Sequence, residues 1–245
     1  MDLDTWRLIP LMEATGAEHM AIDSWLLNQY VQGLQPPSLR FYTWRLPTIS
    51  LGYHQHQFPD HWKTLKHNGQ PIDLVRRPTG GRAVLHQGEL TYALVTSGLA
   101  GSRREVYQQL CQFLIEGWQA LGVELSFGNT ERSYVKSPNC FGTATAADLV
   151  TNDGYKLIGS AQVYREGSVL QHGSMRLQPD SELFYRVFGE NVRQPTLPNQ
   201  LVKKDSLMSI TETLTRAASK CFDAKFEEYR LSSKQRSACF KGCLS

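Results

Sequence analysis

The stretch that most constrains this 245-residue chain is RRPTGGRAVLH at residues 76–86. Its two adjacent glycines, Gly80 and Gly81, allow positive φ and remove the Cβ atoms that would keep a ligand away from the backbone. Strand-like segments precede it at residues 72–75 and follow it at residues 90–95. Arginines on both sides of the turn offer fixed guanidinium forks to an anionic or carbonyl-bearing partner. An ordinary Gly-Gly turn with solvated arginines is the common alternative to a ligand-binding loop. The rest of the sequence is needed to decide between the two.

Composition excludes several classes of function. The hydrophobic fraction of 41% and the charged fraction of 20% are ordinary for a soluble globular protein. A net charge of +3 is too small to predict nucleic-acid binding, although a mildly basic surface can steer an acidic protein partner. No apolar run approaches the roughly 18 residues of a membrane span. The N-terminus lacks the basic flank and apolar core of a signal peptide, so we expect a cytoplasmic protein.

The cysteines and histidines do not predict a metal site. Five cysteines at irregular spacing form no disulfide framework, and we expect them to be reduced. Cys239 and Cys243 would lie one turn apart in a helical tail, but two thiols fall short of the four ligands of structural zinc. His54 and His56 have no third ligand nearby, so we interpret them as loop or surface histidines.

Periodicity and turn signals predict an α+β layer fold. We expect helices at residues 17–32, 103–121, 181–188 and after residue 205 or 209. We expect strands at residues 39–44, 49–52, 72–75, 90–95, 123–125, 148–150, 156–159 and 168–172. Ser102 and Glu105 form a capping box that opens the clearest helix. The Asn152-Asp153-Gly154 run is a strong hairpin signal, and residues 55–69 indicate a loop with a helical turn.

The segment from Arg76 to Thr91 resembles the signature of the lipoate/biotin protein ligase superfamily, R-R-x-T-G-G-x-A-V-x-H. It is most similar to the octanoyl-[acyl-carrier-protein]:protein N-octanoyltransferase branch, in which R-R-P-T-G-G-R-A-V-L-H is followed by E-L-T-Y. Arg82 supports this branch, because the ATP-using lipoate ligases more often have a third glycine there. Similarity also runs through residues 21–23, 41–44, 50–53 and 159–162.

This resemblance implies a mixed, mainly antiparallel sheet flanked by helices, as in biotin/lipoate protein ligase catalytic domains. Residues 1–200 would form the acyltransferase catalytic domain, with residues 201–245 a C-terminal helical segment packed on it. The implied reaction moves an octanoyl group from acyl carrier protein to a lysine of a lipoyl-accepting protein. That acceptor would be a lipoyl domain or a glycine-cleavage H-type protein. No metal, nucleotide or redox cofactor is required.

The resemblance also implies the catalytic residues. Cys140, in the small, polar loop sequence Pro138-Asn139-Cys140-Phe141-Gly142, matches the cysteine that carries the acyl group in the octanoyltransferase branch. Lys156 matches the lysine of the G-x-K-x-x-G-S-A pattern, although an isolated lysine at a hairpin is usually a solvated charge. A nearby ammonium would favour the Cys140 thiolate and hold a developing oxyanion. Cys111 is expected to be a structural thiol.

The expected acyl-binding residues come from the signature loop and two later strands. Gly159, Ser160 and Ala161 are small and would leave room for an acyl chain. For His86 and His172 we expect hydrogen-bonded positions and assign neither as a general base. The full set of expected substrate-binding residues is Arg77, Thr79, Gly80, Gly81, Arg82, Ala83, His86, Gly159, Ser160, Ala161 and His172.

Two other functions remain open from the sequence. An ATP-dependent lipoate-protein ligase would use the same loop and Lys156 but activate a free acid as an adenylate. Arg82, Cys140 and the absence of a further domain after about residue 200 are expected to disfavour it. A non-catalytic relative that only binds an acyl group or carrier protein is the third possibility, against which stand Lys156 and the unbroken signature. The acyl chain length, the acceptor and the oligomeric state are not encoded in any motif.

Overall fold

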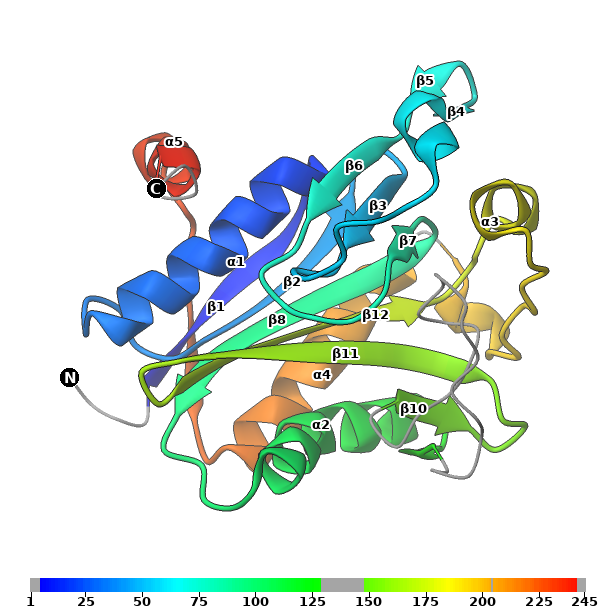
Figure 1. The fold of residues 1–245 in the computed structure, drawn as a ribbon. Coiled ribbons are helices and arrows are strands. Elements are labelled where there is room, and N and C mark those ends of the chain that lie inside the picture. Colours follow the sequence, from blue (N-terminus) through cyan, green and yellow to red (C-terminus); the bar gives the residue numbers. More distant parts are fainter. Residues whose placement is uncertain (1–4, 129–147, 204, 242–245) are drawn as a thin grey trace.

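The computed structural model describes residues 5–128, 148–203 and 205–241 (Figure 1). This part of the chain folds around an eight-stranded sheet in the order β13-β1-β2-β8-β12-β11-β10-β9. The two pairs that include β1 are parallel and the other pairs are antiparallel. The strands are β1 (Thr5–Ala14), β2 (Ser38–Trp44), β8 (Glu89–Ser97), β9 (Leu125–Phe127), β10 (Asp148–Thr151), β11 (Lys156–Arg165), β12 (Ser168–Arg176) and β13 (Lys225–Glu228).

A smaller sheet lies beside the main one and carries the signature loop. In it β3 (Thr48–Leu51) pairs in parallel with β6 (Asp73–Arg76) and antiparallel with β7 (Val84–His86). The 77–83 loop therefore joins the two strands on either side of β3. Before it come a 3-10 turn, η1 (Asp60–Thr64), and a short hairpin, β4 (Lys66–His67) and β5 (Gln70–Pro71).

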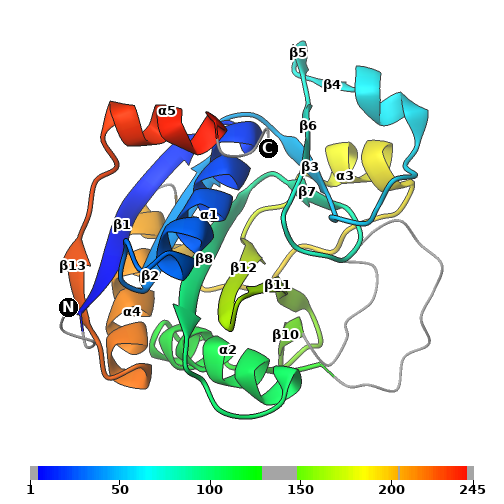
Figure 2. The ribbon, with the colours of Figure 1, turned by 60° about the vertical axis from the view of Figure 1, so that its left-hand side comes forward.

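Helices cover both faces of the main sheet. Helix α1 (Gly16–Val31) and the small sheet lie on one face, and α2 (Arg103–Ala120) and α4 (Ser206–Cys221) lie on the other (Figures 1 and 2). Helix α5 (Ser233–Lys241) packs beside α1. The remaining helical segments are α3 (Ser181–Phe188) and η2 (Asn199–Leu201).

Each face of the sheet has its own apolar core. The core beneath α2 and α4 includes the fully buried side chains of Phe113, Trp118 and Leu214. Ile22 and Leu26 of α1 pack on the opposite face. Burial of apolar area stabilises the fold by roughly 25 cal/mol per Å². These two cores therefore hold the sheet in place, and the sheet fixes the positions of the residues that project from it.

The main sequence predictions for the fold are confirmed. The α+β class, the mainly antiparallel sheet and the 152–154 hairpin are as expected. Ser102 accepts from the Glu105 backbone N–H, and the Glu105 side chain accepts from the Ser102 N–H, completing the predicted capping box of α2. His54 and His56 are exposed in a loop. No described helix is long and apolar enough to cross a membrane.

Five strands were missed. Two of them, β4 and β5, have two residues each and lie at or just past the end of the stretch interpreted as a loop. The other three were missed for physical reasons. Strand β1 contains Pro10 within an irregular register between Ile9 and Met12, and proline within a run argues against a strand except at such irregularities. Strand β13 is a short, largely exposed sheet edge without an apolar pattern. Strand β7 lies inside the signature, where the glycines suggested a continuous loop.

Candidate functional site

Arg77 organises the signature loop from within. Its Nε–H and Nη2–H groups donate to the Gly80 carbonyl at 3.2 and 2.7 Å, and Nη2 also donates to the Arg82 carbonyl at 2.7 Å. Its Nη1 donates to the Ser50 carbonyl at 2.9 Å and to the Ser50 hydroxyl at 3.2 Å. The sequence suggested a fork presented to an anionic partner, but these five bonds tie the fork to the loop and to β3.

The two glycines of the loop have different structural roles. Gly81 has φ +95°, which favours glycine, and its carbonyl lies so close to Gly52 that a Cβ on Gly52 would be 1.8 Å away. Gly80 has no atom within 4 Å of an added Cβ. The close approach of Gly52 to Gly81, together with the bond from the Tyr53 N–H to the Thr79 carbonyl at 2.8 Å, seats the loop on the end of β3.

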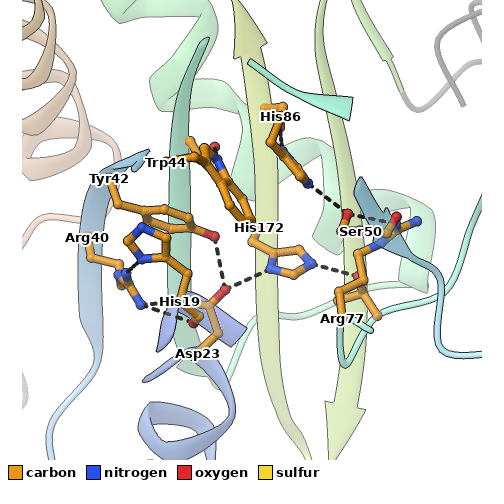
Figure 3. Close-up of polar contacts among 12 residues, drawn as sticks. His19, Asp23, Arg40, Tyr42, Trp44, Ser50, Arg77, His86 and His172 are labelled. Atoms are coloured by element: carbon orange, nitrogen blue, oxygen red, sulfur yellow. Dashed lines mark hydrogen bonds and ion pairs between the residues drawn. The ribbon is translucent and has the colours of Figure 1, made fainter. Parts of the chain in front are cut away.

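A chain of hydrogen bonds connects the loop to the sheet core (Figure 3). The Thr79 hydroxyl lies 2.6 Å from Nε2 of His172 on β12, and Nδ1 of His172 lies 2.9 Å from the Asp23 carboxylate of α1. An ionised carboxylate only accepts, so Nδ1 of His172 donates to Asp23, and Nε2 is the ring nitrogen that faces the Thr79 hydroxyl. We call these three residues the Asp23 relay.

Asp23 is fully buried and is stabilised as a carboxylate by strand β2. Arg40 donates to its Oδ1 at 3.0 Å and the Tyr42 hydroxyl donates to its Oδ2 at 3.2 Å. Burial by itself would raise the pKa of Asp23, but the Arg40 charge and the His172 bond outweigh it and hold the pKa below its usual value. Burial and the Asp23 charge raise the pKa of Tyr42 well above normal.

His19 completes this buried cluster as a neutral imidazole. Arg40 donates from Nη2 to its Nδ1 at 2.7 Å, and its Nε2–H donates to the Thr43 carbonyl at 2.9 Å. Burial and the neighbouring Arg40 charge lower the pKa of His19 to about 3. The Arg40 guanidinium therefore bridges a carboxylate and a neutral histidine in a fully enclosed site.

A second chain of bonds starts from Glu89 at the beginning of β8. Its Oε1 accepts from His86 Nδ1 at 2.6 Å, from the Ser174 hydroxyl at 2.7 Å and from the Thr91 hydroxyl at 2.9 Å. Burial lowers the pKa of His86, with Glu89 opposing the shift. The neutral ring accepts at Nε2 from the Ser50 hydroxyl at 2.7 Å, and Ser50 in turn contacts Arg77.

Two cavities meet at the stacked rings of Trp44 and His86, whose centroids lie 3.8 Å apart. The narrow cavity, about 40 Å³, is lined by Gly159, Ser160 and Ala161 of β11, together with residues that include Met20, Arg77 and His172. The wide cavity, about 540 Å³, is lined by Glu89, which is bonded to His86, and by residues that include Glu13 and Lys203.

The structure brings together most of the residues expected to bind substrate. Arg77, His86, His172 and residues 159–161 line the narrow cavity. Thr79 and Ala83 are fully buried behind it. Gly80, Gly81 and Arg82 are not among its lining residues; they form the outer part of the loop that Arg77 holds in place.

Lys156 is buried, contrary to the usual behaviour of a hairpin lysine. It begins β11, is 6% exposed, and its Nζ lies 2.9 Å from the carboxylate of Asp148 on β10. A buried charge requires a partner, and Asp148 supplies it. This pairing fixes the position of the ammonium.

Cys140 lies outside the described residues. Of the cysteines that the structure does describe, Cys111 is fully buried, and burial raises its pKa to about 12. Burial also raises the pKa of Cys221 to about 12, with Glu116 adding to the shift. Neither thiol has the lowered pKa of a nucleophilic cysteine. Among the described residues, no group of three or more histidine, cysteine or acidic side chains could hold a metal ion.

The sequence analysis assigned no role to several residues of the site. Asp23, Tyr42 and Ser50 lie in segments that carried the resemblance, so their positions were available although their contacts were not. Arg40 gave no local signal, because the fold places it beside Asp23 and His19 of α1. Glu89 lies in the signature segment close to its partners His86 and Thr91, but its contact with Ser174 depends on the pairing of β8 with β12.

Comparison with known proteins agrees with this geometry. The sequence model of the lipoyl protein ligase A/B catalytic domain matches residues 15–226. The chain belongs to this family. Its relatives include octanoyltransferase LipM of Halalkalibacterium halodurans, 34% identical over 92% of this chain and 87% of the relative. LipM of Carboxydothermus hydrogenoformans is 36% identical over 96% of this chain and 93% of the relative.

Solved structures of the family share the fold. Protein Ta0514 from T. acidophilum with bound lipoic acid superposes with a TM-score of 0.78 at 22% identity, covering 98% of this chain and 95% of that one. Lipoate-protein ligase A bound with ATP gives a TM-score of 0.74 at 22% identity, covering 97% and 93%. The predicted family and its catalytic-domain fold are therefore confirmed.

The contact between Gly52 and the loop yields the first prediction. Gly52→Ala places a methyl group against the Gly81 carbonyl and must displace the loop, so we expect acyl transfer by the folded protein to fall by about 100-fold or more. Gly80→Ala is the matched control, since its methyl group enters open space, and should retain most activity. Equal activity of the two variants would contradict this role of Gly52.

The buried histidine yields the second prediction. Because the folded-state pKa of His19 is about 3 and the unfolded value is near 6.5, its stabilisation is present above pH 6.5 and is lost as pH falls towards about 3. His19→Gln should reduce the slope of unfolding free energy in this window by up to about 1.4 kcal/mol per pH unit. Urea denaturation across the window measures the slope, and the exposed His54→Gln should leave it unchanged. A wild-type slope in His19→Gln would refute the assignment.

Proposed function

We propose that this protein is an octanoyltransferase of protein lipoylation, which moves an octanoyl group from acyl carrier protein to a lysine of a lipoyl-accepting protein. The observation that carries the proposal is its relation, at 34 to 36% identity over more than nine-tenths of the chain, to proteins named octanoyltransferase LipM. These relatives are named as acyltransferases, and the chain is assigned to the same class of enzyme. The acceptor would be a lipoyl domain or a glycine-cleavage H-type protein, modified in the cytoplasm.

The narrow cavity supports an acyl substrate. Its walls at Gly159 and Ala161 carry little side-chain volume, and the backbone there is held in register by β12. The octanoyl chain would lie along this part of β11, under the loop that Arg77 and the Asp23 relay keep in place. A rigid groove of this kind lowers the ordering cost of binding a flexible chain.

The proposed reaction has two thioester steps. The Cys140 thiolate attacks the carbonyl carbon of the carrier thioester, an S–C bond forms, and the carrier thiol leaves after taking up a proton. The acceptor amine then attacks this acyl-enzyme, an N–C bond forms, the S–C bond breaks, and the departing Cys140 thiolate takes up the proton that the amine nitrogen loses. Lys156 would favour the thiolate and stabilise the oxyanion of each tetrahedral intermediate. Dividing the transfer in this way replaces one difficult aminolysis with two easier steps.

The alternative is an ATP-dependent lipoate-protein ligase. This alternative is supported by the fold that the chain shares with ATP-bound lipoate-protein ligase A and by the signature loop, which a ligase would also use. It differs in one requirement that can be measured, because a ligase forms an acyl adenylate from free acid and ATP. A transferase takes an acyl group that is already activated as a thioester.

The proposal predicts transfer without nucleotide. Purified protein should octanoylate an acceptor domain from octanoyl carrier protein with no ATP or magnesium added, as followed by mass spectrometry of the acceptor. Without acceptor, the enzyme should gain one octanoyl mass that hydroxylamine removes. The Cys140→Ala variant should form no adduct, and its rate of transfer to the acceptor domain should fall by at least about 1000-fold. The Cys221→Ala variant should form the adduct and transfer it at the wild-type rate. Transfer that requires free octanoate or lipoate and ATP would move the assignment to ligase.

A further inference from the structure

One buried carboxylate oxygen in the described chain has no partner and belongs to a residue beside the acyl cavity. Glu89 is 6% exposed and lines the wide cavity. Its Oε1 accepts all three bonds that the carboxylate receives, while Oε2 is buried and has no hydrogen-bond partner among the described residues. An unsatisfied buried acceptor is destabilising, and a donor that arrives with a ligand would satisfy it.

The surroundings of Glu89 restrict what that donor can be. The wide cavity reaches the surface at the exposed Glu13 and Lys203 and ends at His86 and Trp44, which also wall the acyl cavity. A ligand that extends along the wide cavity would therefore bring its tip beside the acyl group. The charged and titratable groups around Glu89 are His86 on β7, Arg176 opposite it on β12, and Glu13, His67 and Lys203 around the cavity.

We propose that Glu89 receives the ε-ammonium of the acceptor lysine and takes one proton from it. This inference rests on the proposed octanoyltransferase function and assigns the second half of that reaction. A lysine ammonium has no lone pair, so it must lose a proton before it can attack a thioester. A long cationic side chain fits a cavity that is open at Glu13 and Lys203 and is lined beside His86 by Glu89, whose buried Oε2 lacks a donor among the described residues.

The proton balance is complete with the groups named. One ammonium proton moves to Glu89 Oε2, the neutral amine nitrogen bonds to the acyl carbon, and the C–S bond of the acyl-enzyme breaks. A second amine proton goes to the departing thiolate, the third remains as the amide N–H, and Glu89 returns its proton to water. His86 is a positioning residue here, since its Nδ1–H bond fixes the Glu89 carboxylate at 2.6 Å.

The test separates the two half-reactions. In Glu89→Gln the octanoyl adduct should form from octanoyl carrier protein at a rate within about threefold of wild type, while transfer to the acceptor domain should slow by about 100-fold, the usual contribution of a general base. Hydroxylamine, which is already a neutral amine near neutral pH, should discharge the Glu89→Gln adduct at the wild-type rate. Glu227→Gln, an exposed residue of β13 that lines neither cavity, is the matched control and should transfer normally.

Each other outcome has a defined meaning. Equal slowing of adduct formation and transfer would show that Glu89 serves the donor or the fold, and would overturn the inference. Normal transfer by Glu89→Gln would overturn it as well. If wild-type protein forms no adduct from octanoyl carrier protein, the proposed function itself fails, and this result is distinct from either of the others.

Discussion

The buried carboxylate of Asp23 is the interaction on which the rest of the site depends. It lies on α1, yet its three hydrogen-bonding partners come from β2 and β12, and one of them, His172, is bonded in turn to Thr79 of the signature loop. An ion buried this deeply is tolerated only when its partners are all in place. The free-energy cost of burying this charge without its partners therefore favours one arrangement of helix, sheet and loop over others. The position of the loop is fixed by its contact with this buried cluster.

The loop is held from two sides by different chemistry. Thr79 is bonded to the Asp23 relay, whereas Arg77 binds the loop carbonyls and reaches Ser50, which leads on to His86 and Glu89. Both chains, drawn in Figure 3, contribute residues to the lining of the narrow cavity, His172 from one and Ser50 and His86 from the other. The β11 residues that line it, Gly159, Ser160 and Ala161, are small. The polar contacts of these two chains are already formed in the folded protein, so the loop is positioned before a substrate binds.

The sequence predicted the elements that follow local rules. The capping box of α2, the Asn-Asp-Gly hairpin and the apolar faces of the helices are local patterns, and all three appear in the structure. The signature loop was recognised as the centre of the site. The role of Arg77 was not predicted, because it depends on the conformation of the loop, whose Gly80 and Arg82 carbonyls turn toward the guanidinium, and on Ser50 of β3. Glu89 and Asp148 were missed because their burial and pairing depend on how the strands are arranged in the sheet. The role of Cys140 stays a prediction.

The central claim is that the Asp23 relay holds the signature loop on β3, and amide hydrogen exchange tests it most directly. Thr79→Val removes the hydroxyl that binds His172 and keeps a similar shape. The amides of Tyr53 and Arg77, which donate to the Thr79 and Leu51 carbonyls, should then exchange at least about tenfold faster, while amides in the middle of β8 keep their wild-type rates. Unchanged exchange at Tyr53 and Arg77 in a folded Thr79→Val protein would contradict the claim.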